Sequence, residues 1–533
     1  MADDSDGMEM GTPPPISRSL EIALGDQEVV TIDLDSLDQS TDDVIAVLQD
    51  ARCRVLIWTQ LASEYWRRGW LESAQKITNA AVEFFKLERD RESLAPVYLL
   101  LANIQIDSSR AAPKMKLESA QLDVLGNALL KDVYLSEATA LMNHAGAFQS
   151  SADLSFLTRG IHQLARHSTI NEALSTFQDI LQVKPTNVVA LHGKARILYM
   201  QRKYRDSLQI YQRILRLSPQ ARPDPRIGIG LCLWQLGEKQ KAKKAWERCL
   251  ELDSGHWVPQ LLLGLEALNA SKDPQKTEEQ RRQAYATGSK YIERSFHGNQ
   301  KNGATANCLS EYFIRRGEQR KALKLAERAI QFADSITVLS EGHLRAGRVA
   351  HLEERYDDAI NHYNHAKNLP LASIGIAQCH IKRGETAAAI HALDTMLSSS
   401  ETQNTTEAMI MLASLRASER PGLSSAETAA DKLKARELYE RVKKSATAHT
   451  NGSAKKMNGA TSSASVVKKA SWMSDMEMHL ELARLWETED AQKALIAYQD
   501  ARRNSASTPK GVDPRIVNNI AVLIHQDGSI NEA

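Results

Sequence analysis

Cysteine, glycine and proline are all scarce in this chain of 533 residues. Its 26 glycines and 15 prolines fall below average usage, which excludes the collagen-like and low-complexity classes. The 5 cysteines lie far apart and form no C-x-x-C pair, a pattern that indicates reduced core thiols rather than a disulfide framework. No apolar run reaches the roughly eighteen residues needed to cross a bilayer, so we expect no membrane contact.

A large excess of charge is missing as well. The chain has 67 basic and 66 acidic side chains, a formal net charge of +1, so it offers no strong field for phosphates and we expect no direct nucleic acid binding. The distribution is nevertheless uneven. Residues 1–50 contain 13 acidic side chains and 1 basic one, which leaves a net charge of +13 for residues 51–533.

Catalytic motifs are also absent: the sequence has no G-x-x-x-x-G-K-[ST], no H-E-x-x-H and no G-x-S-x-G. Histidines gather between residues 343 and 391, and His362 and His365 lie three apart, a spacing at which two imidazoles share a metal. No cysteine or carboxylate at ligand spacing completes that site, which favours surface and groove histidines. We therefore expect no enzymatic activity, no metal, no cofactor and no small-molecule ligand.

The acidic N-terminal region carries three successive patterns. Residues 1–19, with three consecutive prolines, predict a disordered acidic tail. Residues 20–52 predict an extended segment and a short helix. Apolar and polar side chains alternate over residues 30–35 as in a half-buried strand. Residues 42–50 predict a short helix that has one apolar face and Thr41 as its N-cap candidate. We favour a strand that packs on its own chain over one that adds to a partner's strand.

From residue 53 onward the sequence repeats. Pro185 and Pro219 end two similar stretches that lie 34 residues apart. The next unit continues the same order of small, turn, small and aromatic positions: Gly230, Gly237, Ala242 and Trp246. This period and order are typical of the tetratricopeptide repeat, a pair of antiparallel helices. Small residues let the two helices cross closely, and the aromatic side chain fills the gap between units.

The repeats predict an all-α fold, a right-handed α-solenoid of tetratricopeptide repeats behind a short acidic N-terminal extended segment. We expect a repeat array over residues 53–444 and further units over residues 472–533, about eleven in all. Two polar segments, 271–283 and 418–430, interrupt units between their helices. The last unit ends where its second helix should begin, so we expect the chain to be a fragment of a longer protein.

Residues 445–471 are rich in serine, alanine, asparagine and glycine and predict a disordered linker. A nucleic-acid-binding tail is the alternative. It is disfavoured because the segment has only 4 lysines and no aromatic side chain on which a base could stack.

First helices of such an array line its concave surface, where extended or helical partners bind. In three of four successive units the first-helix residues that face away from the second helix are apolar. They form a predicted partner-binding stripe, to which we add the acidic residues of the N-terminal segment: Leu157, Ile161, Leu164, Ile227, Leu231, Trp234, Leu261, Leu265, Leu268, Asp33 and Asp35. The alternative is that the stripe residues pack against each other across a tight superhelix.

Three stretches of the chain resemble the Ctr-nine family, the large repeat subunit of the RNA polymerase II-associated factor (PAF) complex. They are the acidic segment from Glu21 to Asp35, the segment Ala190–Ala195 followed by Tyr204 and Arg205, and the segment Pro514–Ala521. The resemblance runs over nearly the whole chain from about residue 20. The chain departs from the family in the 445–471 insertion and in the missing further repeats and charged tail.

The resemblance implies a nuclear, non-catalytic scaffold that binds other PAF subunits, notably the namesake subunit and the parafibromin-like subunit. It also implies an association with RNA polymerase II through the complex, a role in transcription elongation, and support of histone ubiquitination and methylation. The alternative is the repeat part of another assembly, such as a ubiquitin-ligase subunit or a sugar transferase.

Overall fold

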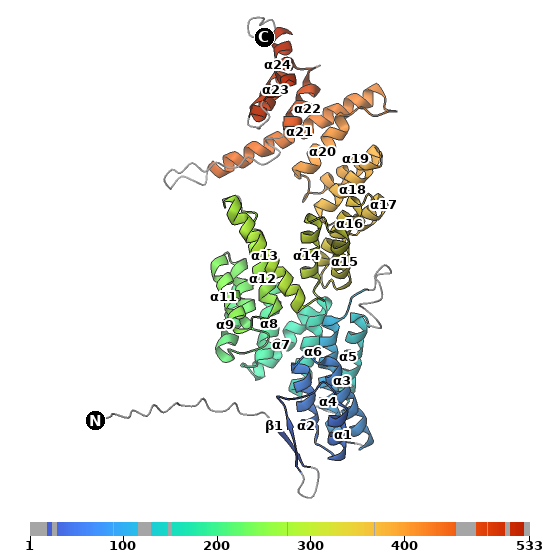
Figure 1. The fold of residues 1–533 in the computed structure, drawn as a ribbon, viewed down its shortest axis with the longest axis vertical. Coiled ribbons are helices and arrows are strands. Elements are labelled where there is room, and N and C mark those ends of the chain that lie inside the picture. The colour runs from blue at the N-terminus through green and yellow to red at the C-terminus, as the bar shows by residue number, and fades with distance from the viewer. Residues whose placement is uncertain are drawn as a thin grey trace, which may run out of the picture. The chain divides into compact units, whose positions relative to one another are not determined.

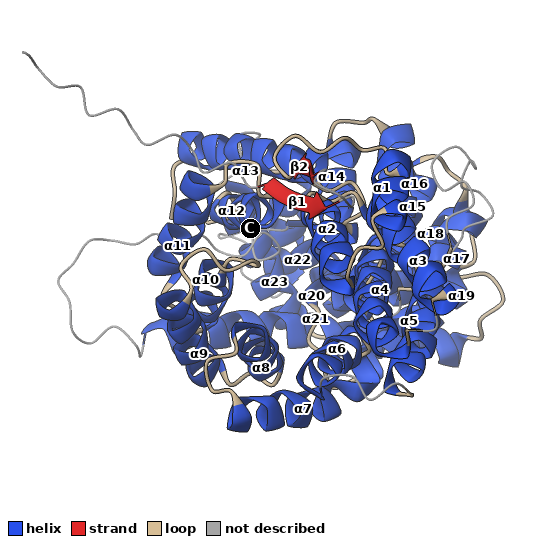
Figure 2. Cartoon of the chain, turned by 90° about the horizontal axis from the view of Figure 1, so that it is seen from below, coloured by secondary structure: helices blue, strands red, loops and turns tan. Residues whose placement is uncertain are grey.

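The computed structural model describes residues 19–23, 29–88, 90–115, 129–147, 152–273, 275–366, 368–454, 476–487, 489–506 and 512–526. Helices make up almost all of it, as Figure 1 shows, and the strands of the described residues are confined to one hairpin near the N-terminus (Figure 2). The predicted all-α solenoid of helix pairs is therefore confirmed. The chain divides into two compact units, each of which is described by itself.

The first unit comprises Met1–Ala270, Ala284–Thr305 and Gln331–Ala333. Its helices run as follows: α1 (Asp42–Asp50), α2 (Val55–Arg67), α3 (Leu71–Leu87), α4 (Arg91–Ala111), α5 (Lys131–Gly146), α6 (Ala152–Ala165), α7 (Ile170–Val183), α8 (Val188–Met200), α9 (Tyr204–Leu217), α10 (Pro225–Gln235), α11 (Lys239–Leu252) and α12 (Trp257–Ala270), with a 3-10 turn at His167–Thr169. Three helices contribute residues to both units: α13 (Glu278–Gly298), α14 (Gly303–Arg315) and α15 (Gln319–Gln331).

The second unit comprises Ser271–Gln283, Ala306–Ile330 and Asp334–Ala533. Its further helices are α16 (Ile336–Leu352), α17 (Tyr356–Asn364), α18 (Pro370–Lys382), α19 (Thr386–Ser398), α20 (Thr406–Ala417), α21 (Ser425–Ala454), α22 (Met476–Trp486), α23 (Ala491–Ala506) and α24 (Pro514–Gln526). A single hydrophobic cluster joins α18 to α24, with Tyr439 and Tyr498 among its fully buried side chains.

The turn inside six of the helix pairs is built in the same way. A residue with positive φ stands two positions after the first helix ends and two before the second begins: Gly69, Arg202, Gly237, Gly317, Glu354 and Gly384. Glycine suits this left-handed conformation because it has no Cβ. Arg202 (φ 63°) and Glu354 (φ 61°) adopt it despite their side chains, so the repeat geometry overrides local preference there.

Glycines and aromatic side chains interlock between neighbouring helix pairs. The ring of Phe177 on α7 lies where a Cβ on Gly160 of α6 or on Gly193 of α8 would come within 2.7 Å or 2.3 Å of it. Within a single pair, Trp246 of α11 fills the same kind of space beside Gly230 of α10, where an added Cβ would lie 2.1 Å from its Nε1. The expectation that small residues admit an aromatic side chain between units is thus confirmed.

The N-terminal segment forms an antiparallel hairpin of β1 (Ser19–Ala23) and β2 (Val29–Asp33). The predicted alternation is confirmed: Val30 and Ile32 are half-buried, and Thr31 and Asp33 are exposed. The strand pairs within its own chain, which is the favoured interpretation, but its partner β1 was not predicted. Helix α1 has the predicted bounds, although the side chain of Thr41 makes no capping hydrogen bond.

Two predicted interruptions are shorter in the structure. Helix α13 begins at Glu278 and helix α21 at Ser425, both inside the polar segments 271–283 and 418–430. Helix α21 also continues to Ala454, past the predicted start of the linker at residue 445. Residues 455–471, like residues 1–18 of the predicted tail and 527–533 of the last unit, lie outside the described residues.

Candidate partner-binding groove

The nine predicted stripe residues lie on α6, α10 and α12, which are first helices of three of the four successive pairs from α6 to α13. Most of their side chains are half-buried; Leu261 is 8% exposed and Leu265 is 37% exposed. The stripe is therefore neither a fully open apolar surface nor a closed core. Its use by a partner stays a prediction.

Helix α6 uses its stripe residues in two neighbouring cores. Leu157 and Leu164 pack against the cluster around Phe177, which joins α6, α7 and α8. Ile161 packs against a separate cluster that includes Ala102 of α4 and Ala138 of α5. These contacts hold adjacent helix pairs together, so part of the apolar character of α6 is explained by packing within the chain.

Helix α10 presents the largest stripe side chain. Leu231 and Trp234 pack beside a cluster made by Ala242, Trp246 and Leu263. The rings of Trp234 and Trp246 are 5.8 Å apart, and the Lys239 ammonium lies 5.3 Å from the centre of the Trp234 ring. The Trp246 Nε1 donates to the carbonyl of Ile227 at 3.4 Å. Trp234 is half-buried, so its side chain packs on Trp246 and also keeps some exposure to solvent.

Helix α12 likewise has both buried and exposed stripe residues. Leu261 is buried, Leu265 is exposed and Leu268 is half-buried. The side chain of Leu268 lies against Gly288 of α13, where an added Cβ would approach its Cγ to 3.0 Å. Leu265 is thus the most accessible of the nine stripe residues.

Helix α8 interrupts the apolar stripe. Arg196 is exposed, while His192 lies edge-on to Tyr211 with ring centres 6.0 Å apart. Burial is the main cause that lowers the pKa of His192, so its imidazole is neutral at pH 7. Sequence reasoning missed two exposed apolar residues of α8, Val189 (47% exposed) and Met200 (45% exposed). Extending the repeat register to both ends of each first helix would have found them.

The two acidic candidates lie elsewhere, on the hairpin segment. Asp33 ends β2, Asp35 follows it, and both are exposed. The backbone N–H of Asp35 donates to Oδ1 of Asp33 at 2.8 Å, which holds the two residues in a tight turn. The structure therefore places these carboxylates on a different element from the apolar stripe.

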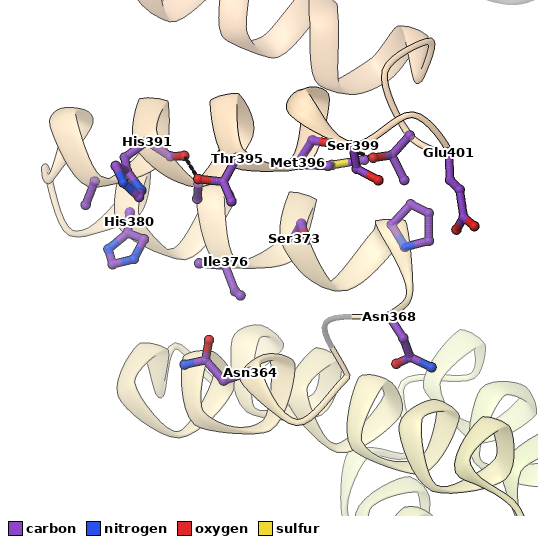
Figure 3. A pocket seen from close by; sticks show the side chains of 14 residues that line it. Asn364, Asn368, Ser373, Ile376, His380, His391, Thr395, Met396, Ser399 and Glu401 are labelled. Atoms are coloured by element: carbon purple, nitrogen blue, oxygen red, sulfur yellow. Dashed lines mark hydrogen bonds between the residues drawn. The ribbon is translucent and has the colours of Figure 1, made fainter.

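The second unit contains a cavity that the sequence did not indicate (Figure 3). It has a volume of about 620 Å³ and lies between α17, α18 and α19. Helix α17 has 9 residues and ends at Asn364, which lines the cavity. His380 and His391 lie at one end of the cavity and Glu401 at the other (Figure 3). The Nδ1 of His380 is 2.7 Å from Glu385 Oε2.

Four of the five cysteines are buried, and two histidines of α16 and α17 lie close together. Burial raises the pKa of the Cys249 thiol to about 12 and that of Cys379 to about 11, which keeps both protonated at pH 7. His343 and His362 bring their Nδ1 atoms within 3.2 Å, yet no group of three His, Cys, Asp or Glu side chains in the described part of the chain has metal-binding geometry. Within the same residues, no helix combines the length and apolar content of a membrane span.

Comparison with known proteins points to one group of relatives. A tetratricopeptide repeat family model matches residues 226–256, which hold α10 and α11. "Tetratricopeptide repeat protein 1" of Schizosaccharomyces pombe is 30% identical over 97% of this chain and 47% of its own length. "RNA polymerase-associated protein CTR9" is 24% identical in Caenorhabditis elegans, over 95% of this chain and 41% of the relative. The Saccharomyces cerevisiae protein of that name is 26% identical over 68% and 34%. The chain thus spans less than half the length of each.

Two solved structures show similarity over different shares of the chain. One, described as the anaphase-promoting complex hetero-tetramer Cut9–Hcn1, has a TM-score of 0.41 and 13% identity, covering 90% of this chain and 91% of that one. The other, PilF of Pseudomonas aeruginosa, has a TM-score of 0.33 and 14% identity, covering 41% of this chain and 89% of that one.

Proposed function

We propose that this chain, a tetratricopeptide repeat homologue of the RNA polymerase-associated CTR9 proteins, is a non-catalytic scaffold of the PAF transcription elongation complex. The observation that carries the proposal is the extent of the homology. Matches to relatives of known association with RNA polymerase run over 95% of the chain in one case and 68% in another, rather than over a single repeat.

In this proposal the chain works in the nucleus and joins the namesake and parafibromin-like subunits to a complex on RNA polymerase II. The complex supports histone ubiquitination and methylation through enzymes that it recruits. The physical support is the arrangement of first helices in the first unit, where accessible apolar side chains such as Leu265 and Trp234 alternate with buried ones. An interface needs a few such anchors surrounded by neutral contacts.

The proposal is tested by affinity purification of the intact protein from nuclear extract, with identification of the partners that remain bound. Recovery of PAF subunits and RNA polymerase II is the expected result. Recovery of cell-cycle ubiquitin machinery, or of a sugar-transferase activity carried by the same polypeptide, would replace the proposal with one of the two alternatives.

The stripe itself is tested by two variants, Trp234→Ala and Leu231→Asp, with circular dichroism as the control for folding. Truncating a large aromatic anchor commonly costs about 2 kcal/mol or more of binding free energy. We therefore expect the affinity for the namesake or parafibromin-like subunit to fall by roughly thirtyfold in a folded Trp234→Ala variant. Unchanged affinity in both folded variants would assign the stripe to internal packing.

A further inference from the structure

The β1–β2 hairpin is a ribbon fixed to the first unit. Five residue pairs define its register, from Ser19 opposite Asp33 to Ala23 opposite Val29. One face packs against the cluster of α1 to α4, where Ile22 is 1% exposed and Leu20 and Ile32 are partly buried. An isolated two-stranded hairpin is only marginally stable in water, so this packing is what keeps the ribbon formed.

Arg68 fastens the segment that follows the hairpin. Its guanidinium, just after α2, donates to the backbone carbonyls of Leu34 and, at 3.4 Å, Leu37. The same guanidinium lies 5.3 Å from the centre of the Trp70 ring. The ribbon is therefore held in a defined orientation by the helices beneath it.

The outer edges of the ribbon have no backbone partner in the part of the chain that the structure describes. The backbone hydrogen bonds outside regular elements include none from residues 19–23 or 29–32. A two-stranded sheet presents an outer edge on each strand, and such edges pair readily with another strand. Natural proteins commonly protect them with proline or lysine, and neither residue occurs in the two strands here.

The exposed face of the ribbon is acidic. Glu21 and Asp33 point away from the packed face, since both are exposed while Ile22 and Ile32 beside them are buried or half-buried. Asp35 adds a further exposed carboxylate beyond β2. Like charges opposite each other on paired strands are destabilising, so a second copy of the hairpin is a poor partner. Opposite charges stabilise a pair, which favours a strand with basic side chains on the same face.

We propose that an outer edge of this hairpin receives an extended, basic segment of a partner protein as a third strand. Main-chain hydrogen bonds supply affinity, and lysine or arginine at alternate positions supplies specificity through Glu21 at the β1 edge or Asp33 at the β2 edge. The inference deepens the proposed scaffold function and rests on it, because it assigns one contact of that scaffold by its chemistry.

A synthetic seven-residue peptide of alternating lysine and valine is a suitable probe, with a fluorescent label at one end. Its binding to the full chain is measured by fluorescence anisotropy, and amide hydrogen exchange locates the site. We expect binding together with slower exchange of amides in residues 19–23 or 29–33. A peptide with the same lysines but proline in place of valine has no N–H at those positions, and it should bind at least about tenfold more weakly.

Two double variants are compared. The test variant reverses two charges on the ribbon, and the control variant reverses two charges on other elements. Glu21→Lys with Asp33→Lys should weaken binding of the lysine–valine peptide by about tenfold or more, because the attraction to the carboxylate on the paired strand becomes repulsion whichever edge is used. Glu83→Lys with Asp179→Lys changes the net charge equally at exposed positions on α3 and α7, and should leave binding unchanged. If the ribbon double variant unfolds, Glu21→Gln with Asp33→Asn serves in its place.

Equal binding of the proline peptide, or equal weakening by the two charge reversals, would overturn the proposal in favour of unspecific electrostatic attraction. Absence of peptide binding would overturn it outright. The scaffold function has a separate readout, because partner recovery from nuclear extract does not depend on this peptide. Trp234→Ala, which lies on α10, should leave peptide binding unchanged.

Discussion

At the scale of single residues, the most constrained positions are the glycines that admit an aromatic ring. Gly230 of α10 faces Trp246, and an added Cβ would lie 2.1 Å from the Trp246 Nε1. Real Cβ atoms do not approach another heavy atom so closely, so either the ring or the helix must move. Gly146, the last residue of α5, has nothing within 4 Å of such a Cβ.

Replacing Gly230 by alanine should therefore destabilise the first unit by about 1–3 kcal/mol, the usual range for overpacking. The larger changes Gly230→Leu and Ala242→Leu should cost at least as much, since Ala242 is fully buried in the same cluster. Gly146→Ala is the matched control and should be neutral or stabilising by up to about 1 kcal/mol. Thermal unfolding measures both. Wild-type stability in Gly230→Ala would place this glycine outside the packing contact.

At the two turns without glycine, a substitution is expected to raise the stability rather than lower it. Arg202 and Glu354 hold the left-handed conformation that glycine occupies at the other turns. Replacing either by glycine removes a strain of roughly 1–2 kcal/mol but adds flexibility to the unfolded chain, so a net gain of about 0.5 kcal/mol is expected. Gly237→Arg, the reverse exchange, should be destabilising. Chemical denaturation decides the sign, and a loss of stability in Arg202→Gly would contradict the strain argument.

At the scale of elements, α16 and α17 meet through three imidazoles. The Nδ1 atoms of His343 and His362 are 3.2 Å apart, and the His365 ring stacks on His343 with centres 4.8 Å apart. Burial, followed by the neighbouring His362 and His365, lowers the pKa of His343 to about 4. Burial also lowers the pKa of His362, although the nearby Asp358 carboxylate acts in the opposite direction.

This arrangement predicts an acid-sensitive helix pair. The His343 imidazole binds a proton near pH 6.5 in the unfolded chain but only near pH 4 in the folded chain. The stability that comes from neutral His343 is therefore fully present above pH 6.5 and is lost as the pH falls toward 4. Replacing His343 by glutamine should flatten the dependence of Tm on pH between 7 and 5. The comparison is made with the wild type, because other buried histidines titrate in both proteins. Parallel curves for the two proteins would contradict the prediction.

The hairpin gives a second prediction at this scale. Removing the Arg68 guanidinium leaves the carbonyls of Leu34 and Leu37 without a donor. Arg68→Ala should therefore speed amide hydrogen exchange in residues 19–23 and 29–33 by about tenfold, while the helices keep their protection. Lys76→Ala, at an exposed position of α3, is the control. Unchanged exchange in the hairpin would show that apolar packing holds it without the arginine.

At the scale of the whole molecule, the repeats form a chain of local contacts. Within each unit, helices such as α2 to α11 and α16 to α24 pack mainly on their sequence neighbours. Folding energy is then supplied locally, so a polar segment between two pairs should contribute little to stability. Deleting residues 455–471, which are poor in large apolar side chains, should leave partner binding and thermal unfolding unchanged. The deletion is compared with wild type in the purification experiment, and lost partners would assign that segment a binding role.

The sequence by itself determined the architecture, because the repeat encodes local geometry. A small residue at Gly230, a turn at Gly237 and an aromatic at Trp246 specify a helix pair and its neighbour without reference to distant parts of the chain. The alternation in β2 likewise followed from its own residues.

Only the tertiary structure decided which apolar residues are available to a partner. Leu261 and Leu265 lie four apart on one helix and look alike in sequence, yet the first is 8% exposed and the second 37%. Exposure depends on how the neighbouring helices close around each side chain. The pairing of β1 with β2 could not be predicted from the sequence for a similar reason. A two-stranded hairpin forms only where it packs against other elements, here the helices of the first unit. The cavity beside α18 also arose at this level, because residues of α17, α18, α19 and the segment after α19 line it together.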